Sequence, residues 1–135
     1  MSQAAVDDPS WERLDARLKW LVYDKSVVHD DLVRSRQAIY ERPEMRQAMR
    51  NILTMHTPET RMRYGITPEQ WQQIKAPTLV LWTDHDPTAA VAVGEALHAA
   101  IPGSKLVVMQ GCGHWPQFED AATFNRIHIE FLRGQ

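Results

Sequence analysis

The stretch PTLVLW, residues 77–82, is a continuous apolar run in which polar residues do not alternate. Such a run is typical of a β-strand that is buried on both faces of a parallel sheet. A helix is expected from about Thr88 to Ala100, closed by Pro102-Gly103, and Lys105–Met109 follows as a second short strand. We therefore predict a right-handed parallel crossover made of strand, helix and strand.

A final helix that carries Phe124, Ile127 and Phe131 on one face follows the second strand. Two parallel strands are too few for independent stability, since a parallel sheet must be covered on both faces. The 135 residues suffice for one domain of ordinary size, but they contain no third strong strand pattern. We predict an α/β fold and expect this sequence to be the end of a larger protein.

The N-terminal half is predicted to be helical. A first helix is expected after Asp8-Pro9, a cap followed by proline at the first helical position, and its apolar stripe consists of Trp11, Leu14, Leu18 and Leu21. A second helix is expected from Asp30 or Asp31 toward Glu41, and a third from Pro43 through Leu53. Residues 67–70 have the pattern of a short capped helix in a segment rich in helix breakers.

Composition excludes several classes of protein. The chain is 44% hydrophobic and 24% charged with a net charge of −2, which is ordinary for a globular domain and leaves no basic surface for nucleic acid or anionic membrane. The single cysteine, Cys112, excludes a disulfide framework and a thiolate-rich zinc site. No apolar run approaches the roughly 18 residues of a membrane span, and no signal pattern opens the chain. We expect a cytoplasmic location.

Candidate functional groups follow both predicted strands, at the sheet edge where open α/β sheets keep such groups. Asp84-His85-Asp86 follows the first strand, and His114 lies in the loop Gly111–Pro116 after the second. The imidazole could act as a general base, and a carboxylate could accept its Nδ1 proton. Alternatively, Asp84 or Asp86 caps the next helix and His114 is a turn residue. Their positions at adjacent strand ends favour a catalytic pair.

Arg36 interrupts the apolar stripe of the second predicted helix, formed by Leu32, Val33, Ile39 and Tyr40. Two interpretations are open. The side chain extends to water or pairs with a nearby carboxylate, or its guanidinium binds a substrate carboxylate in a pocket. Spacing alone slightly favours the first.

Other chemistry has weaker support. Cys112 lies too close to His114 in the chain for a nucleophile–base pair, and a small residue in a glycine turn explains it. The Asp84–Asp86 stretch with His114 has no helical His pair or Cys pair that would indicate a metal site. We expect no metal.

Taken together, the sequence resembles the C-terminal part of an α/β-hydrolase. Within that fold it is most similar to the meta-cleavage product hydrolases, which split a carbon–carbon bond in the diketones formed by ring-opening of catechols. Three stretches carry the resemblance: residues 22–26 followed by Leu32 and Arg36, residues 77–87, and residues 111–119 followed by 124–126.

The resemblance implies a fold and a domain organisation. Residues 1–64 would be part of a helical cap, or lid, domain. Residues 65–135 would be the C-terminal part of the hydrolase core, with its last two parallel strands and their helices.

The resemblance also implies site residues. Asp86 rather than Asp84 would be the triad acid, because it stands 28 residues before His114, the separation found in the family. His114 would be the base, and Arg36 and Trp115 would bind substrate. The family usually has arginine after the triad aspartate, where this chain has Pro87, and that difference bears on substrate preference or on the turn.

The family's nucleophile is a serine in a Gly-x-Ser-x-Gly turn. None of the five serines has that context: Ser2, Ser10, Ser26, Ser35 and Ser104. We therefore expect this chain alone to be inactive, since an Asp–His pair without a nucleophile and an oxyanion hole has little to activate.

For an intact enzyme, the resemblance implies hydrolytic cleavage of a 2-hydroxy-6-oxo-hexa-2,4-dienoate in aromatic degradation, with no metal or organic cofactor. The partners would be the small dienoate and further copies of the enzyme, but neither nucleic acid nor membrane. Two alternatives remain: another hydrolase activity, on esters, lactones or haloalkanes, and a non-catalytic interaction module.

Overall fold

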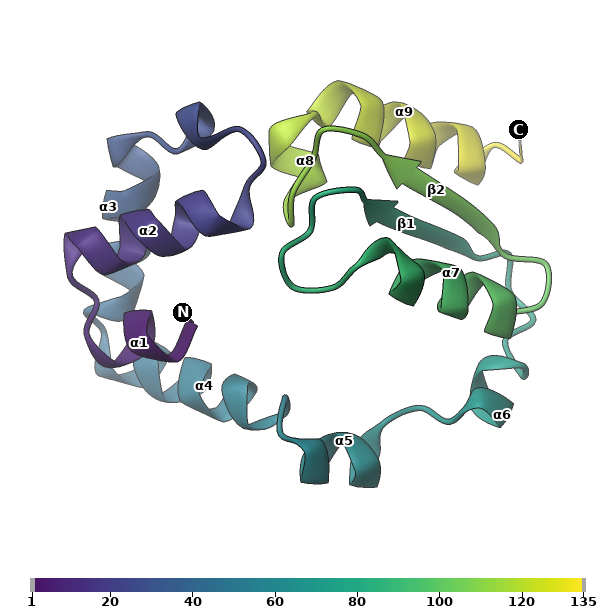
Figure 1. The fold of residues 1–135 in the computed structure, drawn as a ribbon, viewed down its shortest axis with the longest axis horizontal. Coiled ribbons are helices and arrows are strands. Elements are labelled where there is room, and N and C mark those ends of the chain that lie inside the picture. The colour runs from purple at the N-terminus through teal and green to yellow at the C-terminus, as the bar shows by residue number, and fades with distance from the viewer. Residues whose placement is uncertain (1, 135) are drawn as a thin grey trace. The chain divides into compact units, whose positions relative to one another are not determined.

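Two parallel strands and a crossover helix form the C-terminal half of the computed structural model, which describes residues 2–134. Strand β1 (Leu79–Thr83) pairs with β2 (Lys105–Met109), and Leu79 lies opposite Lys105. Helix α7 (Val91–Ala100) connects them, and α9 (Ala121–Leu132) follows β2. Figure 1 shows α7 and α9 on opposite sides of the two strands. The predicted strand–helix–strand crossover and the final helix are confirmed.

Each face of this small sheet packs against one helix. On the α9 face, Met109, Cys112 and Ile127 are buried, and partly buried apolar side chains from both strands and α9 pack against them: Leu79, Leu81, Val107 and Phe124. On the α7 face, Gly94 lies so close to Trp82 that a Cβ would stand 2.9 Å from the indole Cδ2. Both faces of β1 are therefore used in packing, as its unbroken apolar run predicts.

The remaining elements are short helices. Before the sheet come α1 (Ser2–Asp7), α2 (Trp11–Leu21), η1 (Lys25–Val27), α3 (Asp30–Tyr40), α4 (Pro43–Thr54), α5 (Pro58–Tyr64) and α6 (Pro68–Trp71), and α8 (Pro116–Glu119) lies between β2 and α9. Helices α3 and α4 match their predicted ranges. Helix α6 has the predicted capping box, in which the Thr67 side chain accepts from the Gln70 backbone N–H and the Gln70 side-chain oxygen accepts from the Thr67 backbone N–H.

Two predicted helix starts were wrong. Helix α2 begins at Trp11 instead of Pro9: α1 ends at Asp7, residues 8–10 are not helical, and the backbone N–H of Leu14 bonds to the carbonyl of Ser10. Helix α7 begins at Val91 instead of Thr88, because the backbone N–H of Thr88 bonds to the Asp86 side chain in a turn. Helices α5 and α8 were not predicted. Helix α5 does carry a start signal, since the Thr57 side chain caps it and Pro58 occupies its first turn.

The described residues divide into two compact units. The helical unit comprises residues 2–20 with Val28–Ile66, and its buried side chains include Val6, Leu14, Leu18, Val33 and Tyr40. The α/β unit comprises Leu21–Val27 with residues 67–134. The assignment of residues 1–64 to a cap and 65–135 to a hydrolase core stays a prediction. Between residues 2 and 134, no helix has the length and apolar character needed to cross a membrane.

Candidate active site

His114 and Asp86 meet at the carboxyl ends of the two strands. Asp86 lies in the loop after β1, His114 lies in the loop after β2, and His114 Nδ1 stands 2.9 Å from Asp86 Oδ2. The Asp86 side chain is 14% exposed, whereas the imidazole is 41% exposed. A shielded carboxylate thus holds one nitrogen of a histidine that solvent or a ligand can still reach. This geometry suits a general base with an orienting acid.

Thr88 completes the surroundings of Asp86. The Thr88 backbone N–H and hydroxyl both bond to Asp86 Oδ1, each at 2.7 Å, so the two carboxylate oxygens have separate partners. Burial disfavours the charged form of Asp86, but the hydrogen bonds from Thr88 and His114 outweigh it and hold the pKa of Asp86 below its ordinary value. Asp86 is therefore ionised near neutral pH. Sequence reasoning missed Thr88.

Asp84 bonds to the backbone of the loop after β2 instead of to His114. Its carboxylate accepts from the backbone N–H groups of Gly111 at 3.0 Å and Cys112 at 3.3 Å, and it pairs with His85 Nδ1 at 2.8 Å. Asp84 thereby ties the loop after β1 to the loop after β2. The alternative that Asp84 or Asp86 caps the next helix is wrong, because α7 is capped at Ala90 without any side-chain hydrogen bond.

The loop that carries His114 is held closely by its neighbours. The buried Thr83 hydroxyl donates to the Gly113 carbonyl at 2.7 Å, and the His114 N–H donates to the Leu21 carbonyl at 2.7 Å. A Cβ at Gly113 would stand 2.8 Å from the Tyr23 backbone nitrogen and would also meet the Leu21 carbonyl oxygen. Glycine at 113 is therefore required for this close approach of two backbones.

Glu119, the last residue of α8, joins the same loop to the segment Leu21–Val27. Its carboxylate accepts from the backbone N–H groups of Tyr23 at 2.7 Å, Gly113 at 2.9 Å and Trp115 at 3.1 Å. The amides on both sides of His114 are thus bound to one carboxylate, which holds the backbone that carries the imidazole. Sequence reasoning missed Glu119: Gly113 and Trp115 are only six and four residues away, but Tyr23 is 96 residues away and becomes a neighbour only in the folded chain.

A cavity of about 240 Å³ lies beside the pair. Its lining combines Asp86 and His114 with a mainly apolar wall, which includes Leu81, Trp82, Thr83, Gly113 and Pro116. An apolar cavity with a base at its edge is suited to a small organic substrate. Trp115 is half-buried, does not line this cavity, and packs edge-to-face on Phe118 with ring centroids 6.4 Å apart. Its role in substrate binding stays a prediction.

Arg36 belongs to the helical unit, on α3. It is half-buried, and its guanidinium carbon lies 5.9 Å from the centre of the Tyr40 ring. Burial lowers the pKa of Arg17 in the same unit; Tyr40 opposes that shift, and the positive charge of Arg36 adds to it. The helical unit therefore contains two partly buried arginines whose charges interact. Substrate binding by Arg36 stays a prediction.

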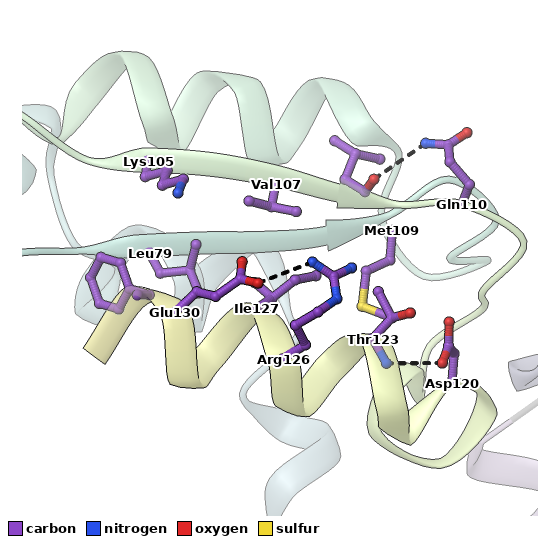
Figure 2. A pocket seen from close by; sticks show the side chains of 12 residues that line it. Leu79, Lys105, Val107, Met109, Gln110, Asp120, Thr123, Arg126, Ile127 and Glu130 are labelled. Atoms are coloured by element: carbon purple, nitrogen blue, oxygen red, sulfur yellow. Dashed lines mark hydrogen bonds and ion pairs between the residues drawn. The ribbon is translucent and has the colours of Figure 1, made fainter. Parts of the chain in front are cut away.

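A second, larger cavity of about 480 Å³ lies between β2 and α9 (Figure 2). Its lining is mixed, with Val107 and Ile127 beside charged residues such as Arg126 and Glu130, which form an ion pair at 3.4 Å. None of Asp86, His114 and Trp115 lines it. Size alone therefore does not identify the candidate site.

The structure also describes the surroundings of Cys112 and of the possible metal ligands, the two kinds of chemistry that the sequence disfavours. Cys112 is buried, and burial together with the charges of Glu119 and Asp120 raises the pKa of its thiol. A protonated, buried thiol is a poor nucleophile. Across residues 2–134, no three His, Cys, Asp or Glu side chains gather in a way that could hold a metal ion.

Comparisons with known proteins agree on the fold. A family model described as the alpha/beta hydrolase fold matches residues 13–121. The chain is 33% identical over 127 residues to the 2-hydroxy-6-oxononadienedioate/2-hydroxy-6-oxononatrienedioate hydrolase of Cupriavidus pinatubonensis, covering 93% of this chain and 42% of that protein. It is likewise 33% identical to the 2-hydroxy-6-oxo-6-phenylhexa-2,4-dienoate hydrolase of Burkholderia cepacia, with 93% and 43% coverage.

A solved structure gives the same result. The meta-cleavage product hydrolase of Pseudomonas fluorescens superposes with a TM-score of 0.79 at 27% identity, covering 93% of this chain and 46% of that one. The resemblance to meta-cleavage product hydrolases predicted from the sequence is thus confirmed. The chain spans less than half the length of the curated relatives it matches.

Proposed function

Because this chain belongs to the α/β hydrolase fold family, we propose that Asp86 and His114 are the acid and the base of a hydrolytic active site. The observation that carries the proposal is the 2.9 Å contact between His114 Nδ1 and Asp86 Oδ2. A carboxylate at Nδ1 holds the ring in one orientation, leaves Nε2 free to take a proton, and stabilises the imidazolium that results.

The substrate that we propose is a 2-hydroxy-6-oxo-hexa-2,4-dienoate, split at a carbon–carbon bond by the complete enzyme. Two relatives named above carry this hydroxy-oxo-dienoate unit in their names but differ in the group attached to it. His114 assists conversion of the enol to its keto form by moving a proton. Hydrolysis then requires a serine, acting directly or through an activated water, that none of the serine contexts in this chain supplies.

Arg36 and Trp115 have binding roles in this proposal. The dienoate has a carboxylate, and a guanidinium can bind a carboxylate through two parallel hydrogen bonds. Replacing Arg36 by Gln should raise KM about tenfold or more, the cost of losing a charged hydrogen bond, while kcat changes less. Unchanged KM and kcat would return Arg36 to a structural role.

The test of the acid–base assignment is the variant His114→Ala in the complete enzyme that holds this sequence. Loss of the dienoate's absorbance reports turnover, and ester and lactone substrates in parallel assays test the other hydrolase activities. We expect kcat to fall by about four orders of magnitude, as for a member of a catalytic triad. The matched control is His56→Ala at an exposed histidine, which should keep full activity. Turnover retained in His114→Ala would refute the assignment.

Three further expectations belong to the same proposal. The 135-residue chain alone should hydrolyse no dienoate, since no serine in it lies in a nucleophile turn. The complete enzyme should be a homo-oligomer located in the cytoplasm. Turnover by the isolated chain would show that another group in it can act as the nucleophile.

A further inference from the structure

We propose that Thr88 is a positioning residue that fixes His114 in the tautomer with its proton on Nδ1, by holding Asp86 and the imidazole at the same time. The functional meaning of this inference rests on the proposed role of His114 as the base. A base with its proton on Nδ1 presents a free Nε2 lone pair to the substrate.

The contacts of the Thr88 hydroxyl carry the inference. Its oxygen lies 2.7 Å from Asp86 Oδ1 and 3.2 Å from His114 Nδ1. The Thr88 backbone N–H reaches the same Asp86 oxygen at 2.7 Å, and His114 Nδ1 faces the other carboxylate oxygen, Oδ2, at 2.9 Å. The Thr88 hydroxyl therefore lies between Asp86 Oδ1, which accepts hydrogen bonds, and His114 Nδ1, which carries a proton in one tautomer of the neutral ring and a lone pair in the other.

The available protons allow one arrangement in which every contact is satisfied. An ionised carboxylate only accepts hydrogen bonds, so the one hydroxyl proton of Thr88 is directed to Asp86 Oδ1. A lone pair of the hydroxyl oxygen then faces His114 Nδ1, as Asp86 Oδ2 does. Both are satisfied when Nδ1 carries a proton, which leaves Nε2 without one.

The opposite tautomer would break contacts. An Nδ1 lone pair would face Asp86 Oδ2, and the Thr88 hydroxyl could meet it only by turning its proton away from Asp86 Oδ1. Asp86 stays ionised throughout, because hydrogen bonds, including that from the Thr88 hydroxyl, outweigh the burial that opposes its charge and keep the pKa of Asp86 below its ordinary value. The carboxylate is thus an acceptor near neutral pH.

Helix capping does not account for Thr88. Helix α7 starts three residues later, its N-cap is Ala90, and no side chain donates or accepts a capping bond there. The Thr88 side chain is exposed, so it contributes little to the apolar core. Among the described residues, the hydrogen bonds of its hydroxyl are those with Asp86 and His114.

The experiment is a measurement of the His114 ring nitrogen shifts by 15N NMR, in the complete enzyme that holds this sequence, at about pH 8, where an ordinary histidine is neutral. The population-weighted shifts of Nδ1 and Nε2 give the ratio of the two tautomers. The variants are Thr88→Val and Thr88→Ala, which lack the hydroxyl, and Thr88→Ser, which keeps it.

Thr123→Val is the matched control. Thr123 lies beside another carboxylate, with its N–H on Asp120 Oδ1 at 3.0 Å, and its amide and hydroxyl lower the pKa of Asp120. The variant removes a hydroxyl of the same kind beside a carboxylate that takes no part in the contacts among Asp86, Thr88 and His114. It should raise the pKa of Asp120 and leave the His114 tautomers unchanged.

We expect Thr88→Val and Thr88→Ala to raise the ratio of the Nε2–H to the Nδ1–H tautomer roughly three- to tenfold, the effect of one lost hydrogen bond. Titration of the Asp86 carboxyl carbon should move to higher pH in the same two variants. Thr88→Ser should match the parent. Nitrogen shifts equal to those of the parent in both variants without the hydroxyl would overturn the inference, as would an equal change in Thr88→Ser.

This measurement does not depend on turnover. If His114→Ala retained activity in the dienoate assay, the proposed function would fail while the tautomer ratios still tested Thr88. If the tautomer ratios were unchanged while His114→Ala lost activity, Thr88 would be excluded and the acid–base pair would stand.

Discussion

At the scale of single residues, the buried hydroxyl of Tyr40 lowers the free energy of unfolding of the helical unit. Tyr40 is fully buried on α3, and its Oη has no hydrogen-bond partner among the described residues. A buried hydroxyl without a partner costs about 1–3 kcal/mol of desolvation. Tyr40→Phe keeps the ring and removes this cost, so we expect the free energy of unfolding to rise by about 1 kcal/mol, measured by urea unfolding followed by circular dichroism.

The matched control for this variant is Tyr64→Phe on α5. Tyr64 is 70% exposed, so its hydroxyl is solvated before and after folding and its removal should leave the urea midpoint unchanged. A lower midpoint for Tyr40→Phe than for the parent would contradict the prediction, and would show that the Tyr40 hydroxyl forms a stabilising bond in solution.

At the scale of elements, Glu119 connects α8 to the His114 loop and to the segment Leu21–Val27. Glu119→Gln keeps the length of the side chain but replaces one accepting oxygen by an NH₂ group, which cannot accept from the amides it would face. Since hydrogen bonds to charged groups contribute about 1.5–3 kcal/mol, we expect a loss of about 2 kcal/mol in unfolding free energy. The His114 N–H, which donates to Leu21, should also lose protection from hydrogen exchange.

Glu95→Gln on α7 is the control for the same charge change. Glu95 is exposed, so its replacement should leave both stability and exchange at His114 close to those of the parent. If Glu119→Gln behaved like Glu95→Gln, the backbone N–H groups that bond to Glu119 would be able to bond to water or other acceptors without loss of stability. The proposed coupling between α8 and the His114 loop would then be wrong.

The same elements show which features a sequence can predict. Strands β1 and β2 and helices α3 and α4 follow from local patterns of apolar residues, proline and glycine, so their ranges were close to those observed. Helix α5 has no apolar stripe to bury, and its large residues Met62 and Tyr64 are exposed, so periodicity gave no signal.

The candidate site divides in the same way. Asp86 and His114 were predicted to meet because strand ends meet at one edge of a parallel sheet. Glu119 binds Tyr23, which is 96 residues away in the sequence, and Thr88 contacts His114, which lies in a different loop. No local sequence pattern therefore predicts either contact.

At the scale of the whole molecule, the two units differ in how their carboxylates depend on pH. In the α/β unit, burial opposes the charge of Asp84 and Asp86, but hydrogen bonds from Gly111, Thr88 and the neighbouring histidines outweigh it and keep both pKa values below the ordinary one. A carboxyl group whose pKa is depressed by folding stabilises the folded state above its unfolded-state pKa, and that contribution is lost as the pH falls through the folded-state pKa.

In the helical unit, the pKa values of Asp7 and Glu44 are also low, because Gln3 bonds to Asp7 and backbone and Arg42 groups bond to Glu44. These two carboxylates are exposed, so solvent screens their interactions and they contribute little to stability. We therefore expect acidification below about pH 4, the ordinary pKa of an aspartate, to destabilise the α/β unit more than the helical unit.

Hydrogen exchange followed by mass spectrometry measures this difference, because peptides from each unit are read separately in the intact chain. Protection factors at pH 7 and pH 3, corrected for the intrinsic rates, should fall further for β1, β2 and the His114 loop than for α3 and α4. Asp84→Asn should lower protection of the α/β unit at pH 7 and flatten its dependence on pH, because the amide cannot ionise. Equal losses of protection in the two units would show that acid destabilises both units alike. Asp84 and Asp86 would then not account for the pH dependence of stability.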